Sequence, residues 1–234
     1  MLALREVVGL AAAILIFVGL FVPGYRNARS VAMRNSCAEN LRAIGNGYAA
    51  FAASNDGQLP YDGSVPPGAY WSRPPQGRGP IAPNSQHVFT LVNRHFVTPR
   101  ALVCPGRPDD APMAEESVNQ ANGFSDPRNN SYSPMLVVQP LRIEQLEPGT
   151  PAIGDMTPLL DGQRRLVPAG FAPLNSNSHG RSAGQNVLYI DLRVQFHRTP
   201  YVGLDHDDIY RLFGVERYTG LERPRLKTDA FLVP

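Results

Sequence analysis

The sequence contains few of the residues that usually carry chemistry. Among its 234 residues there are two cysteines, five histidines and one tryptophan, and only 18% of the residues are charged. The net charge of +2 argues against a nucleic-acid-binding protein, because such proteins usually concentrate basic residues on one face. Arg26, Arg29 and Arg34 lie close together in the sequence, but they are too few to form such a face. We therefore expect no nucleic-acid partner.

Motifs that identify two large enzyme classes are also missing. The sequence has neither the H-E-x-x-H pattern of zinc proteases nor a nucleotide-binding P-loop. Glycine and proline, in contrast, are abundant at 21 and 23 residues, which favours a loop-rich domain over a helical bundle. We expect a non-enzymatic protein. An enzyme that uses His179 and Asp191, together with His197 and a metal, is the less favoured alternative.

Residues 7–22 form an apolar run, VVGLAAAILIFVGLFV, that contains no charged residue. A helix that spans a membrane needs about 20 apolar residues, so residues 2–22 suffice if Arg5 and Glu6 are tolerated. Three interpretations remain open: a cleaved signal peptide with Arg5 as its charged flank, a single membrane anchor, and the apolar half of a longer helix. In the last two, residues 2–22 lie in a membrane or in the core of a filament.

An amphipathic segment follows the apolar run and extends over residues 25–54. Five apolar residues recur there at steps of four and three, which places them on one stripe of a helix: Cys37, Leu41, Ile44, Tyr48 and Phe51. Asn55-Asp56-Gly57 then supplies a helix stop. One helix over residues 3–53 would be roughly 75 Å long, and Pro23 is expected to kink it.

The N-terminal region resembles that of type IV pilins and type II secretion pseudopilins. Glu6, an unbroken apolar run and Pro23 seventeen residues later match the spacing of those proteins. The segment CAENLRAIG (37–45) is similar to the C-x-x-N-L-x-x-I-G segment of a large bacterial pseudopilin-like family with a C-terminal His…Asp-Gly signature. The residues that match the two signatures are Asn40, Leu41, Gly45, His179, Asn186 and Asp191.

The resemblance implies a structural protein that is anchored by its N-terminal helix. Such a protein lies in the inner membrane with its head in the periplasm, or in a cell-surface filament or pseudopilus formed with other pilin-like subunits. It implies that Glu6 pairs with the N-terminal amine of a neighbouring subunit and that Pro23 takes part in subunit packing. The sequence before Glu6 departs from the usual leader, so processing at Leu2 and an unprocessed anchor both remain open. A membrane-tethered periplasmic binding module that does not polymerise is the alternative.

The two cysteines allow two interpretations. In an oxidising compartment Cys37 and Cys104 can form a disulfide, and otherwise they are free buried thiols. A Cys-Pro like Cys104-Pro105 recurs in the family, so the resemblance favours the disulfide. Two thiols far apart in the sequence offer too few ligands for a metal site by themselves.

The middle of the chain, residues 55–133, is expected to be rich in loops. Tyr70 and Trp71 lie in its Pro/Gly-rich part and are expected to pack on the core of their own domain. Residues 85–97 have helical or mixed character. Short strands are predicted at 134–138 and 151–155. Asp155 and Asp161 are weak candidates for a calcium site, and otherwise no cofactor is expected.

The tail carries the C-terminal signature. Residues 186–196 alternate between apolar and polar, and Leu192 stands where the family has glycine, so a straight strand is predicted through Asp191. His179 and Asp191 are expected to hydrogen-bond and are weak metal-ligand candidates. A helix is predicted over residues 205–214, with Asp205 as its N-cap and Gly214 at its C-terminal end.

These elements predict an α+β fold in which a long N-terminal helix packs on a small antiparallel β-sheet, as in pilins, with large irregular loops. Residues 1–24 form the transmembrane or filament-core half of the helix. Residues 25–234 form the head, with its sheet and C-terminal hairpin in residues 134–234. A helix cannot bury its apolar stripe alone, and the strands offer a face for it.

Overall fold

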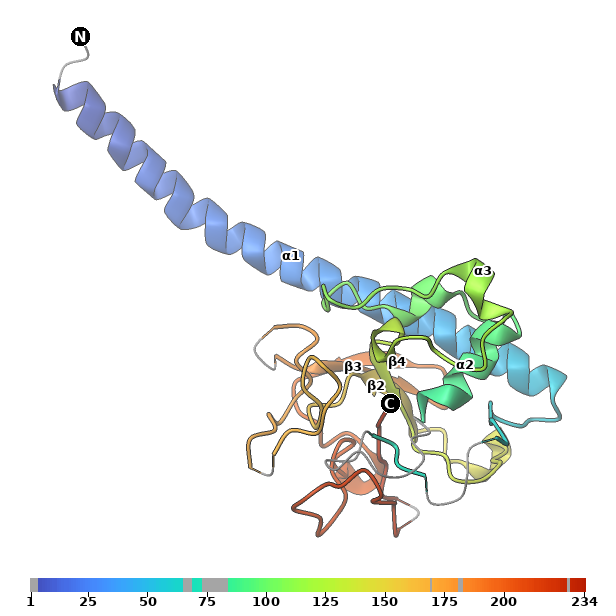
Figure 1. Ribbon diagram of the computed structural model, residues 1–234. Coiled ribbons are helices and arrows are strands. Elements are labelled where there is room, and N and C mark those ends of the chain that lie inside the picture. The colour runs from blue at the N-terminus through green and yellow to red at the C-terminus, as the bar shows by residue number, and fades with distance from the viewer. Residues whose placement is uncertain (1–3, 65–68, 73–83, 169, 181–182, 227) are drawn as a thin grey trace.

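The computed structural model describes residues 4–64, 69–72, 84–168, 170–180, 183–226 and 228–234. Its dominant element is helix α1 (Leu4–Ser54), as predicted. The helix continues through Pro23 and curves without a break (Figure 1). Its first half projects away from the head, and its second half lies against the head (Figure 1).

The side chain of Glu6 lies outside the described residues, so its pairing with a neighbouring subunit stays a prediction. Among the described residues, no helix combines the length and the hydropathy that a membrane crossing requires.

The amphipathic stripe of α1 is confirmed. Cys37, Leu41, Ile44 and Phe51 are buried, and Tyr48 packs against the same cluster. This face of α1 contacts strands β3 (Gln185–Tyr189) and β4 (Val194–His197). It also contacts helix α2 (Ser85–Asn93) and the 3-10 helix η1 (Pro99–Leu102). The helix therefore completes the largest hydrophobic core of the head, as the periodicity of residues 37–51 predicts.

The head contains a four-stranded antiparallel sheet in the order β1-β2-β3-β4, and the predicted pilin-like α+β fold is confirmed. The strands are β1 (Tyr132–Pro134), β2 (Pro151–Asp155), β3 (Gln185–Tyr189) and β4 (Val194–His197). β1 begins before the predicted strand at 134–138 and is shorter, and β2 lies where it was predicted. The remaining short helices are α3 (Glu115–Val118), η2 (Pro127–Asn129), η3 (Ile143–Gln145) and η4 (Leu204–His206).

The straight strand predicted through Asp191 is wrong, because residues 190–193 form the turn between β3 and β4. The amide of Tyr189 donates to the carbonyl of Arg193 (2.9 Å), and Leu192 adopts a left-handed conformation with φ 67°. The Asp191 carboxylate accepts a hydrogen bond from the Arg193 amide (3.0 Å). A left-handed leucine costs about 1–2 kcal/mol, but side-chain and backbone hydrogen bonds close the turn without a glycine. The hairpin itself is as predicted.

The helix predicted over residues 205–214 is also wrong, since only the 3-10 turn η4 forms there. Asp205 and His206 both have positive φ, which interrupts a right-handed helix. The C-terminal residues pair with this segment, because the amide of Leu232 donates to the carbonyl of Ile209 (2.8 Å). Pairing with a distant part of the chain thus overrides the local capping signals at Asp205.

Candidate functional site at the junction of helix and head

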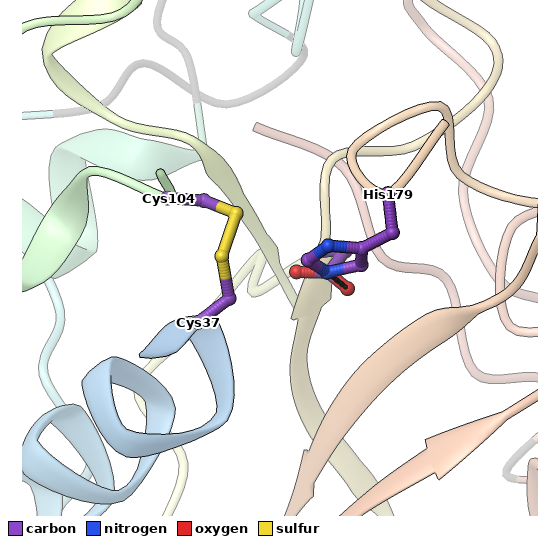
Figure 2. A group of neighbouring side chains, drawn as sticks. Cys37, Cys104 and His179 are labelled. Carbon is purple, nitrogen blue, oxygen red and sulfur yellow. Dashed lines mark hydrogen bonds and ion pairs between the residues drawn. A yellow bond between two sulfur atoms is a disulfide. The ribbon is translucent and has the colours of Figure 1, made fainter. Parts of the chain in front are cut away.

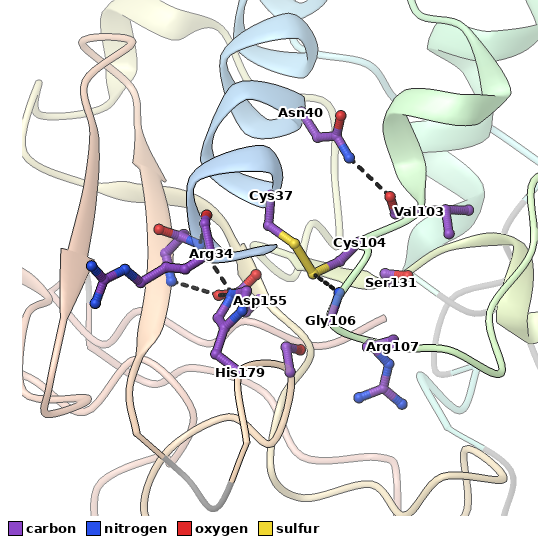
Figure 3. The surroundings of a disulfide bond; sticks show 12 residues. Arg34, Cys37, Asn40, Val103, Cys104, Gly106, Arg107, Ser131, Asp155 and His179 are labelled. Carbon is purple, nitrogen blue, oxygen red and sulfur yellow. Dashed lines mark hydrogen bonds and ion pairs between the residues drawn. A yellow bond between two sulfur atoms is a disulfide. The ribbon is translucent and has the colours of Figure 1, made fainter. Parts of the chain in front are cut away.

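A disulfide joins α1 to the head. Cys37 lies on α1 and Cys104 on the loop after η1, and the Cys37–Cys104 bond is present with both residues fully buried. Figure 3 shows its surroundings, in which the Asn40 amide group donates to the carbonyl of Val103 (2.8 Å) and the Gly106 amide contacts the Cys104 sulfur (3.4 Å). The disulfide interpretation of the two cysteines is therefore confirmed, and Asn40 reinforces the same attachment.

A histidine–aspartate pair lies beside this disulfide. His179 Nε2 is 2.8 Å from Asp155 Oδ2, and their side chains are 2% and 0% exposed. The His179 ring faces the disulfide in Figure 2. Among the described residues, His179 Nδ1 and Asp155 Oδ1 have no hydrogen-bond partner. A substrate cannot reach this pair unless the surrounding chain moves, because both side chains are buried.

Asn186 holds the pair in place from β3. Its backbone amide donates to Asp155 Oδ2 (2.6 Å), and its side-chain amide lies 3.1 Å from His179 Nε2 and donates to the carbonyl of Arg34 on α1 (3.2 Å). The Tyr132 hydroxyl donates to the Cys37 carbonyl (3.4 Å). Burial, followed by the charge of Asp155, raises the pKa of Tyr132, so the hydroxyl stays protonated and keeps this hydrogen bond.

The expected hydrogen bond between His179 and Asp191 is wrong, because His179 pairs with Asp155 instead. Asp191 lies in the exposed turn after β3 and accepts from the Arg193 amide. The weak candidate Asp161 also lies elsewhere and pairs with Arg165 (Nη2 to Oδ2, 2.9 Å). Burial opposes ionisation of Asp161, but hydrogen bonds from Arg165 outweigh it and lower its pKa. Of the four weak metal candidates, the fold brings only His179 and Asp155 together.

Five of the six signature residues gather at this junction. Leu41 is buried under the head, and a Cβ placed on Gly45 would lie 2.9 Å from a methyl group of Leu188 on β3. Asn40, His179 and Asn186 make the contacts described above. These five residues therefore lie where α1 docks on the sheet, whereas the sixth, Asp191, closes the adjacent turn.

Sequence reasoning missed one motif near His179. Residues 180–184 read GRSAG, which fits the G-x-S-x-G pattern of serine-hydrolase nucleophile elbows. An elbow connects a preceding strand to a following helix, whereas here a loop precedes the segment and β3 follows it. Residues 181 and 182 lie outside the described residues. The flanking elements therefore do not provide the context that gives this motif its chemistry.

A second polar cluster lies beside the Cys104 loop, and two of its residues, Arg107 and Ser131, appear among the surroundings of the disulfide (Figure 3). Asp110 Oδ2 pairs with Arg164 (2.7 Å) and Arg107 (2.9 Å) and accepts from the Ser131 hydroxyl (2.7 Å). Burial lowers the pKa of Arg164, with nearby Arg107 acting in the same direction. Arg164 and the buried Trp71 also line a pocket of about 360 Å³. Trp71 packs on the core, as predicted.

The fold and the junction define a class: an α+β protein whose long N-terminal helix is locked to an antiparallel sheet by a buried disulfide. Comparisons of the chain with protein-family models, with curated proteins and with solved structures found no match.

Proposed function

We propose that the protein is a non-enzymatic, pilin- or pseudopilin-like structural protein whose apolar half-helix packs with the same segment of other copies. The observation that carries this proposal is the exposure of residues 14–21 of α1. Their large apolar side chains are exposed, with Leu15 and Leu20 at 72% and 75%. Exposed apolar patches of this kind indicate an interaction surface, and a helix that projects from a head suits a filament core.

The firm attachment of α1 to the head supports the same proposal. A filament transmits force from its helical core to its surface through each subunit, so the helix must not slide on the sheet. The disulfide at Cys37, the hydrogen bond of Asn40 and the close contact at Gly45 all oppose such sliding. A disulfide is also typical of proteins outside the cytoplasm, which fits a periplasmic or surface location.

A second candidate is a membrane-tethered binding module that does not polymerise. The pocket beside Trp71 and Arg164 favours it, because ligand sites are usually concave, largely apolar and equipped with a few polar groups. In this case lipid, and not other copies of the chain, covers the apolar half of α1.

The two candidates differ in what the full chain does after detergent is removed. We expect the wild-type chain to form elongated assemblies in negative-stain electron microscopy without added lipid, and Leu15→Glu to prevent them. Phe213→Glu is the matched control, because Phe213 is an exposed apolar residue of the head. Insertion of single chains into liposomes, with no assembly in their absence, would reject the filament proposal and favour the tether.

A further inference from the structure

We propose that the junction is a redox-dependent zinc site: reduction of the Cys37–Cys104 disulfide creates a four-ligand site with Asp155 and His179. The inference does not depend on filament formation. One candidate ligand atom from each of these four residues lies within 4.8 Å of the other three, and all four residues are buried. They come from α1, the loop after η1, the end of β2 and the loop before β3.

The ligand types match those that zinc prefers. Zinc binds cysteine sulfur at about 2.3 Å and histidine nitrogen or carboxylate oxygen at about 2.0–2.1 Å, usually in a tetrahedron. In such a tetrahedron neighbouring ligand atoms lie about 3.3–3.8 Å apart. The two sulfurs must separate to that distance once their bond is broken, while ligand atoms that lie as far as 4.8 Å apart must move closer by about 1–1.5 Å. The thiolate pair favours zinc over magnesium or calcium, which prefer oxygen ligands.

Buried polar atoms of the cluster that lack hydrogen-bond partners also indicate a bound metal ion. His179 Nδ1 and Asp155 Oδ1 are two of the buried side-chain atoms that have no hydrogen-bond partner among the described residues, and they lie in the same cluster. Buried polar atoms without partners are rare and costly, and reduction would add two buried thiols to them. A metal ion would satisfy these groups together. Asn186, which donates to Asp155, provides the supporting contact that metal ligands usually have.

The redox step is a thiol–disulfide exchange. A dithiol reductant gives two electrons and two protons to the Cys37–Cys104 bond, which yields two cysteine thiols and the oxidised dithiol. Zinc binding then releases the two thiol protons and leaves two zinc–sulfur bonds. The metal replaces the disulfide as the crosslink between α1 and the head, so the docked arrangement persists in a reducing environment.

The packing around Gly106 restricts how the site can open. A Cβ at Gly106 would overlap the backbone oxygen of Ser178 and lie 3.2 Å from His179 Nδ1. The Cys104 loop and the His179 loop are therefore in direct contact. The Cys104 loop must swing away from Cys37 without losing this contact when zinc enters.

The test uses the full chain in nonionic detergent, reduced with a phosphine under anaerobic conditions. Cobalt(II), which reports thiolate ligands through its charge-transfer absorption, is titrated into the reduced and the oxidised protein, and zinc is then added as a competitor. We expect one cobalt ion per reduced chain, displaced by zinc, and no such absorption from the oxidised chain. Equal cobalt spectra in the two states, or no thiolate absorption after reduction, would overturn the proposal.

Variants identify the ligands. His179→Ala is expected to weaken zinc binding to the reduced chain by at least about 10–100-fold, the range known for outer-shell partners. His197→Ala is the matched control, because His197 on β4 hydrogen-bonds to Tyr189 on β3 and not to the cluster. Equal affinity in these two variants would contradict the assignment.

X-ray absorption at the zinc edge of the wild-type protein needs no variant and covers the case in which His179→Ala fails to fold. Two sulfur and two nitrogen or oxygen neighbours are expected. A shell without two sulfurs would overturn the proposal, as would a reduced chain that unfolds and is not refolded by zinc.

Discussion

Gly47 of α1 lies against the segment after α2, and its replacement tests how tightly the helix is docked. A Cβ at Gly47 would overlap a methyl group of Val97 and lie 3.1 Å from the carbonyl oxygen of Phe96. Val97 is buried and β-branched, so it has few ways to move aside. At Gly45, two residues earlier, the nearest atom is instead the flexible end of Leu188 (2.9 Å).

Gly45→Ala and Gly47→Ala gain the same helix propensity but differ in steric cost. Glycine to alanine in a helix interior stabilises by about 1 kcal/mol, and overpacking a core costs about 1–3 kcal/mol. For Gly47→Ala the steric cost exceeds the gain, so we expect a net loss of about 1–2 kcal/mol. For Gly45→Ala the two effects nearly cancel, and we expect a change within about 0.5 kcal/mol.

Urea unfolding in nonionic detergent measures both variants against the wild type. Trp71 is the only tryptophan of the chain and is 1% exposed, so its fluorescence reports unfolding of the head. Both variants keep the disulfide, which makes the comparison independent of the redox state. If Gly47→Ala is as stable as Gly45→Ala or more stable, the docking described for α1 is incorrect.

Three further predictions concern groups in the head. Arg164→Ala should lower the free energy of unfolding, measured in urea, by about 3 kcal/mol, the low end for a broken buried ion pair, because Asp110 keeps a second arginine. The control Arg165→Ala, which breaks an exposed ion pair, should lower it by less than about 1 kcal/mol. Equal losses in the two variants would contradict this account. Replacing both disulfide cysteines with serine should lower the free energy of unfolding by about 4 kcal/mol, because the disulfide joins residues 67 positions apart in the sequence. An unchanged urea midpoint would refute this prediction. Burial raises the pKa of Asp207 from 3.8 to about 6, so the folded state favours its protonated form. Stability should therefore fall as pH rises from about 4 to about 6, by about 1 kcal/mol from Asp207 after allowance for partial exposure. Asp207→Asn should reduce this dependence, and the remainder comes from Asp208 and Asp229, whose pKa values burial also raises.

The sequence predicts best where the structure depends on local patterns. The apolar stripe from Cys37 to Phe51 has the helical period, and the helix and its buried face follow from it directly. The same reasoning fails at Asp205, whose capping signals are real but weaker than the pairing of Ile209 with Leu232. That C-terminal segment is a short apolar run with no periodicity, so the sequence gives no sign that it is buried in the head.

The His179 pair was predicted with the wrong partner for a related reason. Asp191 lies close to His179 in the sequence and within the same signature, whereas Asp155 belongs to a different strand. Only the antiparallel pairing of β2 with β3 brings Asp155 beside the loop that carries His179. No pattern along the chain encodes that pairing.

The turn at Leu192 explains what the C-terminal signature contributes in this chain. A glycine after the aspartate would allow the left-handed conformation at no steric cost, and Leu192 adopts it nonetheless at φ 67°. Asp191 supplies the side-chain hydrogen bond that closes the turn, and the turn sets β4 beside β3 so that Phe196 lies under Arg34 of α1 (4.4 Å). The aspartate is therefore a turn residue and the histidine a junction residue. Both position the sheet for α1.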